Sequence, residues 1–143
     1  MKGLSLFSYI KQVHEGKLKP ADVAKEYLQK AHADPYNAYL RVHDAYVERH
    51  LAEFSHRNLC AAPIAIKDII LTEGEISSCG SKMLENFVAP YSATCFANLE
   101  LQGGLMIGKT NMDEFAMGTT NENSAFGPVK NPVDPTRIPG GSS

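Results

Sequence analysis

The chain has few cysteines, no long apolar run and no surplus of either charge. Its three cysteines are an odd number without a Cys-x-x-Cys spacing, which argues against a disulfide framework and a zinc site. No apolar run approaches the ~18 residues of a membrane-spanning helix. Lysine and arginine number 14 against 16 acidic residues, for a formal net charge of −2, and they form no basic stripe of the kind that binds nucleic acid. We therefore expect a soluble, cytoplasmic protein with reduced thiols.

Signals for a metal site and for an ATP site are missing as well. Lys109 lies near the Gly103-Gly104 pair, but the glycine spacing of a phosphate-binding loop is absent. Asp113 and Glu114 are adjacent and diverge on any regular element, so a helix-start role is favoured over paired acid and base chemistry. The histidines have no metal-ligand spacing and fall on expected helices or their flanks. Each is interpreted as a surface or boundary residue: His14, His32, His43, His50 and His56.

The first part of the chain has the pattern of amphipathic helices. With 143 residues, 43% of them hydrophobic, the chain has the size and composition of one globular domain. Apolar residues at helical spacing predict helices over about 4–14, 20–31 and 45–54, and a short strand is expected over 38–42. Residues 1–58 are therefore interpreted as a largely helical region that packs against the rest of the domain.

From about residue 59 the pattern changes to that of strands. Ile64 and Ile66 alternate with other side chains in the period of a strand, which we expect to continue to about Leu71. Lys67 lies within this strand.

A helix over 92–101, capped by Ser92, and an apolar strand over 105–108 are expected next. A helix between two such strands predicts a βαβ unit and hence an α/β fold. Apart from a short turn at 113–117, glycine, asparagine and proline predict little regular structure towards the end of the chain. Residues 59–143 are interpreted as the start of a catalytic core within the same domain.

Two sites carry the candidate chemistry. Lys67 is delivered by an apolar strand, where loss of water favours the uncharged amine that can accept a proton. Gly140–Ser143 reads Gly-Gly-Ser-Ser, and its glycines allow close approach of the backbone to a ligand beside a hydroxyl that can pass on a proton. Taken singly, each also has a plain interpretation, as a surface lysine and as a flexible loop.

Taken together, the motifs resemble the amidase signature family in order and spacing. The resemblance rests on Pro63–Lys67, Gly108–Gly118, Asn131-Pro132 and Pro139–Ser143. Within that family, Met112–Gly118 and the Ser81–Glu85 segment are most similar to the glutaminase subunits, the A subunits, of the tRNA-dependent amidotransferases.

The sequence departs from the family pattern at two places. Ala61-Ala62 stands where a glycine often precedes the strand, and Ile69 stands where asparagine often follows Lys67-Asp68. Neither position touches the proton path that the resemblance implies.

The resemblance implies the N-terminal part of the amidase signature fold, a mixed β-sheet covered by α-helices. It implies a Ser-Ser-Lys triad in which Lys67 is the base and Ser142 the middle serine, held by a cis peptide bond. The nucleophilic serine of the family comes after this run, so the 143-residue chain is expected to be inactive alone. Ser143 would be structural, and Ala116 and Met117 would line the acyl pocket or have a buried packing role.

The resemblance also implies partners. The intact glutaminase would release ammonia from glutamine for subunits B and C, with ATP and Mg²⁺ bound by its partner. The acceptor would be a misacylated tRNA, Glu-tRNA(Gln) or Asp-tRNA(Asn). Two alternatives remain open on the sequence: a stand-alone amidase, and a non-catalytic fragment that only binds a partner.

Overall fold

A three-stranded mixed sheet forms the centre of the computed structural model, which describes residues 4–143. Its strands are β1 (Tyr39–Val42), β2 (Ala62–Lys67) and β3 (Gly104–Thr110), in the order β1-β3-β2. The central strand β3 pairs antiparallel with β1 and parallel with β2. The parallel pairing of β2 with β3 confirms the βαβ unit expected from the sequence.

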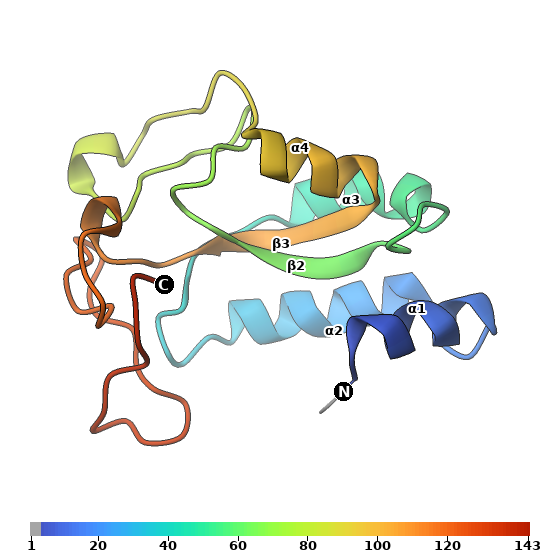
Figure 1. The fold of residues 1–143 in the computed structure, drawn as a ribbon, viewed down its shortest axis with the longest axis horizontal. Coiled ribbons are helices and arrows are strands. Elements are labelled where there is room, and N and C mark those ends of the chain that lie inside the picture. The colour runs from blue at the N-terminus through green and yellow to red at the C-terminus, as the bar shows by residue number, and fades with distance from the viewer. Residues whose placement is uncertain (1–3) are drawn as a thin grey trace.

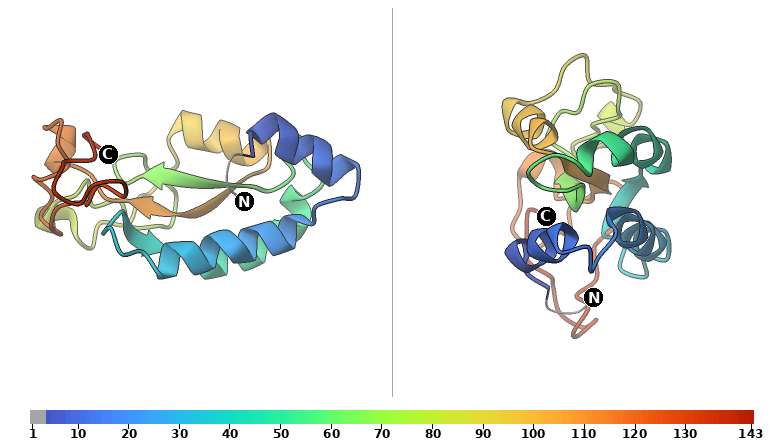
Figure 2. Two further views of the ribbon diagram at one scale, coloured as in Figure 1. Left: turned by 90° about the horizontal axis from the view of Figure 1, so that it is seen from below. Right: turned by 90° about the vertical axis from the view of Figure 1, so that its right-hand side faces the viewer.

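Helices cover both faces of the sheet. Figure 1 shows α1 (Leu6–His14) and α2 (Pro20–His32) on one side, with α3 (Asp44–Phe54) and α4 (Thr94–Leu101) on the other. Two further views show the same layers (Figure 2). None of the helices formed by residues 4–143 is long and apolar enough to cross a membrane.

The core is centred on β3, as its apolar sequence predicts. Leu105, Met106 and Ile107 are at most 1% exposed, because β3 has a strand on each side and helices on each face. Phe96 from α4 and Phe54 from α3 belong to the same cluster of buried side chains. The expected helices and strands of the first 58 residues are all present, with ends that differ by a few residues.

Most of the last third of the chain is loop. Apart from the short 3₁₀ helix η2 (Glu114–Ala116), the residues after Thr110 form turns and extended segments, as expected. These loops and the loop after β2, which contains the 3₁₀ helix η1 (Lys82–Leu84), gather at the end of the sheet where β2 and β3 finish (Figure 1).

Two expected features were wrong. The strand that begins at Ala62 ends at Lys67 rather than near Leu71, because the Ile70 N–H donates to the Lys67 carbonyl at 2.9 Å and closes a turn. Ser92 does not cap the next helix, which begins at Thr94. Its hydroxyl accepts instead from the Glu73 N–H at 3.0 Å, across the loop.

Candidate active site

Lys67 and Ser142, 75 positions apart in the sequence, meet at the end of the sheet. Lys67 is the last residue of β2, and its Nζ donates a hydrogen bond to Ser142 Oγ. Figure 1 shows the C-terminal segment beside the ends of β2 and β3. The Gly141–Ser142 peptide bond is cis, as the family resemblance implies. The fold therefore brings together the two residues that the sequence suggested as base and middle serine.

The segment around η2 holds the backbone of Ser142 in place. The Asp113 N–H donates to the Ser142 carbonyl at 2.7 Å. A Cβ on Gly141 would lie 2.5 Å from the carbonyl carbon of Thr119 and 2.6 Å from Asp113 Oδ2. Only glycine fits at this position, so the Gly140–Ser143 segment packs closely against the loop that follows β3.

Asp113 organises that loop through its carboxylate. The side chain is fully buried and accepts the backbone N–H groups of Asn121 and Asn123, each at 3.0 Å. Burial opposes ionisation, but these hydrogen bonds outweigh it and lower the pKa of Asp113. The expected helix-start position is confirmed, since Asp113 is the residue before η2 and Glu114 is its first residue, but the Asp113 carboxylate binds the following loop and does not cap the helix.

A cavity of about 330 Å³ opens beside the Lys67 side chain. Its volume suits a small-molecule ligand. Asn121 also lines it, and Asn121 Oδ1 is buried without a hydrogen-bond partner among residues 4–143. Such an acceptor is suited to an N–H or O–H group of a ligand. The lining residues are Ala38, Ala65, Lys67, Thr110, Asn111, Asn121, Val129, Pro139, Gly140 and Ser143.

The residues suggested for the acyl pocket lie elsewhere. Met117 is 75% exposed, which excludes a buried packing role for it. Ala116 is half-buried with a left-handed φ of 60°, and neither residue lines the cavity beside Lys67. Substrate binding by Ala116 and Met117 stays a prediction. Ser143, for which a structural role was expected, does line the cavity.

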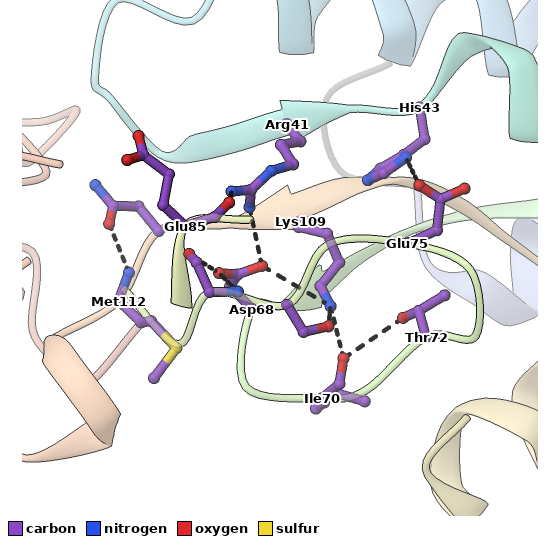
Figure 3. A network of polar contacts seen from close by, with 12 residues as sticks. Arg41, His43, Asp68, Ile70, Thr72, Glu75, Glu85, Lys109 and Met112 are labelled. Carbon is purple, nitrogen blue, oxygen red and sulfur yellow. Dashed lines mark hydrogen bonds and ion pairs between the residues drawn. The ribbon is translucent and has the colours of Figure 1, made fainter. Parts of the chain in front are cut away.

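A network of buried polar side chains lies near the end of β2 (Figure 3). The sequence did not lead us to predict it. Lys109 on β3 is fully buried and donates to the Ile70 carbonyl at 2.6 Å and to Ser77 Oγ at 2.9 Å. Burial lowers the pKa of Lys109 to about 8, although the negative charge of Asp68 opposes this. The signal that sequence reasoning overlooked is a lysine next to the last residue of a largely apolar strand.

Asp68 belongs to this network, and the pair formed by His43 and Glu75 lies near it. The Asp68 carboxylate, also fully buried, accepts from the Ser78 N–H at 2.8 Å and from Arg41 Nη1 at 3.4 Å. His43, expected at the surface or its boundary, has a side chain only 9% exposed, with Nδ1 3.0 Å from Glu75 Oε2. Burial lowers the pKa of His43, and the Glu75 charge opposes that change.

No metal site is formed by the part of the chain that the structure describes. Residues 4–143 contain no group of three or more histidine, cysteine, aspartate or glutamate side chains placed to hold an ion.

Comparison with known proteins agrees with this geometry. A model of the amidase family matches residues 22–143. The chain is 44% identical over 152 aligned positions to the A subunit of the glutamyl-tRNA(Gln) amidotransferase of Exiguobacterium sp., covering 98% of the chain and 32% of that protein. The crystal structure of the corresponding A subunit from Thermotoga maritima matches with a TM-score of 0.78 at 32% identity, over 99% of the chain and 30% of that structure.

A crystal structure of an amidase also matches, with a TM-score of 0.85 at 28% identity over 96% of the chain and 34% of that structure. The chain thus spans about a third of the length of these proteins. The shared architecture confirms the expected fold, the N-terminal part of an amidase signature domain. Because the family model matches residues 22–143, most of the chain, the chain belongs to the amidase family, which is the family that its motifs resemble.

Proposed function

We propose that the complete protein is the glutamine-hydrolysing subunit of a tRNA-dependent amidotransferase. The observation that carries the proposal is the contact between Lys67 Nζ and Ser142 Oγ at the edge of a ligand-sized cavity. The name of the Exiguobacterium relative, which is a glutamyl-tRNA(Gln) amidotransferase component, supports the choice of glutamine as nitrogen donor.

In the proposed mechanism Lys67 is the base and Ser142 passes the proton to it. The uncharged Lys67 amine accepts the hydroxyl proton of Ser142, which accepts one from a nucleophilic serine beyond Ser143. That serine attacks the side-chain amide carbon of glutamine, and the proton on Lys67 returns through Ser142 to the amide nitrogen, so that the C–N bond breaks and ammonia leaves. Water then hydrolyses the acyl-enzyme to glutamate. The contact between Lys67 and Ser142 lies on this path, and the proton can cross it in either direction.

The chain of 143 residues is not expected to hydrolyse glutamine alone. Among residues 4–143, the Ser142 hydroxyl has a single side-chain partner, Lys67. No second serine is therefore held against Ser142 to act as the nucleophile.

Partners follow from the same proposal. Ammonia would pass to subunits B and C, where ATP and Mg²⁺ activate the carboxylate on Glu-tRNA(Gln) or Asp-tRNA(Asn). The complex would act in the cytoplasm, where tRNA is charged.

A stand-alone amidase is the second candidate. It is favoured by the amidase crystal structure, which matches this chain with a higher TM-score than the Thermotoga protein at similar identity. The two candidates share the chemistry of Lys67 and Ser142, and they differ in substrate and in dependence on partner subunits.

Reconstitution separates the two candidates. The complete protein, mixed with subunits B and C, ATP and Mg²⁺, is expected to convert Glu-tRNA(Gln) to Gln-tRNA(Gln) with glutamine as donor. Ammonium chloride as donor serves as the control for the partner subunits. Hydrolysis of simple amides without the partners, together with no glutamine-dependent product on tRNA, would favour the stand-alone amidase.

A further inference from the structure

Lys67 begins a tight turn whose far end is attached to β3. The Lys67 carbonyl accepts the Ile70 N–H at 2.9 Å, which closes a four-residue turn over 67–70. The Ile70 carbonyl in turn accepts a hydrogen bond from Lys109 Nζ at 2.6 Å. Inside the turn, the Asp68 N–H donates to the Thr110 carbonyl at 3.2 Å. Both Asp68 and Ile70 are therefore bonded to β3, and Lys109 supplies the bond at the far end.

Lys109 reaches this turn from the face of the sheet opposite to the Lys67 side chain. In the parallel pairing, Lys109 lies beside Ile66 and Thr110 lies beside Lys67. Since successive residues of a strand point to opposite faces, Lys67 and Lys109 point away from each other. Lys109 therefore acts on the backbone of the turn, and the cavity beside Lys67 is lined without it.

The position of the Lys109 amine is set by partners on several sides (Figure 3). Besides the Ile70 carbonyl, it bonds Ser77 Oγ at 2.9 Å and lies 3.9 Å from Asp68 Oδ1. Asp68 is itself bonded to the N–H and the hydroxyl of Ser78, at 2.8 and 2.5 Å. The amine thus ties the start of the loop after β2 to the segment that returns past it.

Burial of a lysine is unfavourable, because its charge is removed from water and must be paired and hydrogen-bonded to offset that loss. An apolar side chain would fill the volume but leave the Ile70 carbonyl with only the longer hydrogen bond from Thr72 Oγ1, at 3.4 Å. The lysine amine instead holds the Ile70 carbonyl, and with it the end of the turn, in one position.

We infer that Lys109 is a positioning residue that acts through the 67–70 turn and fixes the Lys67 amine against Ser142. Its effect on catalysis rests on the proposed function, but its effect on the geometry of Lys67 does not. A displacement of about 1 Å in a reacting group can cost about 100-fold in rate, so an anchor of this kind matters for turnover.

The first test measures Lys67 directly in the complete protein. Trace labelling with acetic anhydride, followed by mass spectrometry, reports how freely each lysine amine reacts. In Lys109→Met, Lys67 is expected to react several-fold faster, because its amine leaves Ser142 and becomes more exposed. The exposed Lys25 on α2 is the internal standard, with an unchanged rate.

Two control variants separate positioning from general loss of stability. Lys19→Met makes the same chemical change at an exposed site and keeps Lys25 as the standard, and Ile107→Val trims the buried core of β3 without touching the turn. Neither is expected to change the labelling of Lys67. Should Lys109→Met fail to fold, Ser77→Ala removes one of the bonds of the Lys109 amine and is expected to raise Lys67 labelling by a smaller factor.

The second test measures turnover in the complete protein with its partner subunits. Lys109→Met is expected to lower kcat with glutamine about 100-fold while KM changes little, and to leave the ammonium-dependent reaction intact. Unchanged Lys67 labelling in folded Lys109→Met would overturn the inference, and so would an equal fall in kcat for Ile107→Val. Absence of glutamine turnover in the unmodified protein would refute the proposed function, whereas the labelling result would still decide the role of Lys109.

Discussion

At the scale of single residues, the surroundings of each charged group decide what it does. Lys67 and Lys109 lie on adjacent strands, yet one meets a serine hydroxyl beside a cavity and the other is enclosed by backbone and a buried carboxylate. Asp113 is a third case, a buried carboxylate whose bonds are mainly to backbone N–H groups. A charge with such partners shapes a loop without taking part in proton transfer.

The bonds of Asp113 predict a dependence of stability on pH. Because the pKa of Asp113 is lowered in the folded state, its contribution is fully present above its unfolded value, near pH 4, and is lost as pH falls through the folded-state pKa. Asp113→Asn places an amide where two N–H donors converge, and is expected to cost about 1–3 kcal/mol at pH 7. Urea unfolding gives the difference in free energy of unfolding between the unchanged chain and Asp113→Asn, which should shrink below about pH 4. A difference that stays constant down to pH 2 would contradict this role.

At the scale of helices and strands, the spacing of apolar residues predicts those elements whose formation depends on local sequence. The helices of the first 58 residues and the parallel pair β2 and β3 follow from apolar spacing, and each is present. The end of β2 and the start of α4 were misplaced, because hydrogen bonds to residues outside each element set them. The network around Lys109 could not be predicted, since a spacing rule does not reveal which loop will fold back over a strand.

The approach of β1 to β3 depends on one glycine. A Cβ at Gly108 would lie 2.3 Å from the Arg41 carbonyl oxygen, which belongs to the backbone of β1. Gly108→Ala is expected to cost about 3 kcal/mol, the upper range for overpacking. It should also speed hydrogen exchange at the His43 amide, which bonds the Ile107 carbonyl.

Gly74→Ala is the matched control, because Gly74 has a φ of 77° but no atom within 4 Å of an added Cβ. It should cost only the left-handed conformation, about 1 kcal/mol, and leave exchange in β1 unchanged. If the two variants lose equal free energy of unfolding in chemical denaturation and show equal hydrogen exchange in β1, the close approach of β1 to β3 does not depend on Gly108.

At the scale of the whole molecule, the site requires the complete fold of this chain. Lys67 and Ser142 are 75 positions apart, and the segments that hold them come from the sheet and from the final loop. The motifs identified both residues from the sequence, but the cavity, and the Asn121 acceptor that has no partner among residues 4–143, depend on loops with no periodic pattern.

The sheet predicts how the 143-residue chain behaves alone. In the described part of the chain, β2 pairs with β3 on one side and has no strand on the other. Unpaired edges promote association between chains. The isolated chain is expected to self-associate in sedimentation velocity and to bind a hydrophobic dye. A monodisperse monomer that binds no dye would show that this edge is already protected.

The central claim is that Lys67 is the base for glutamine hydrolysis, and a paired assay of the reconstituted complex tests it most directly. Lys67→Ala should lower glutamine-dependent formation of Gln-tRNA(Gln) at least about 100-fold, the usual contribution of a general base, and leave the ammonium-dependent reaction unchanged. Lys67→Arg should fail equally, because arginine stays protonated. Glutamine-dependent activity that persists in Lys67→Ala, beside normal ammonium-dependent activity, would contradict the account.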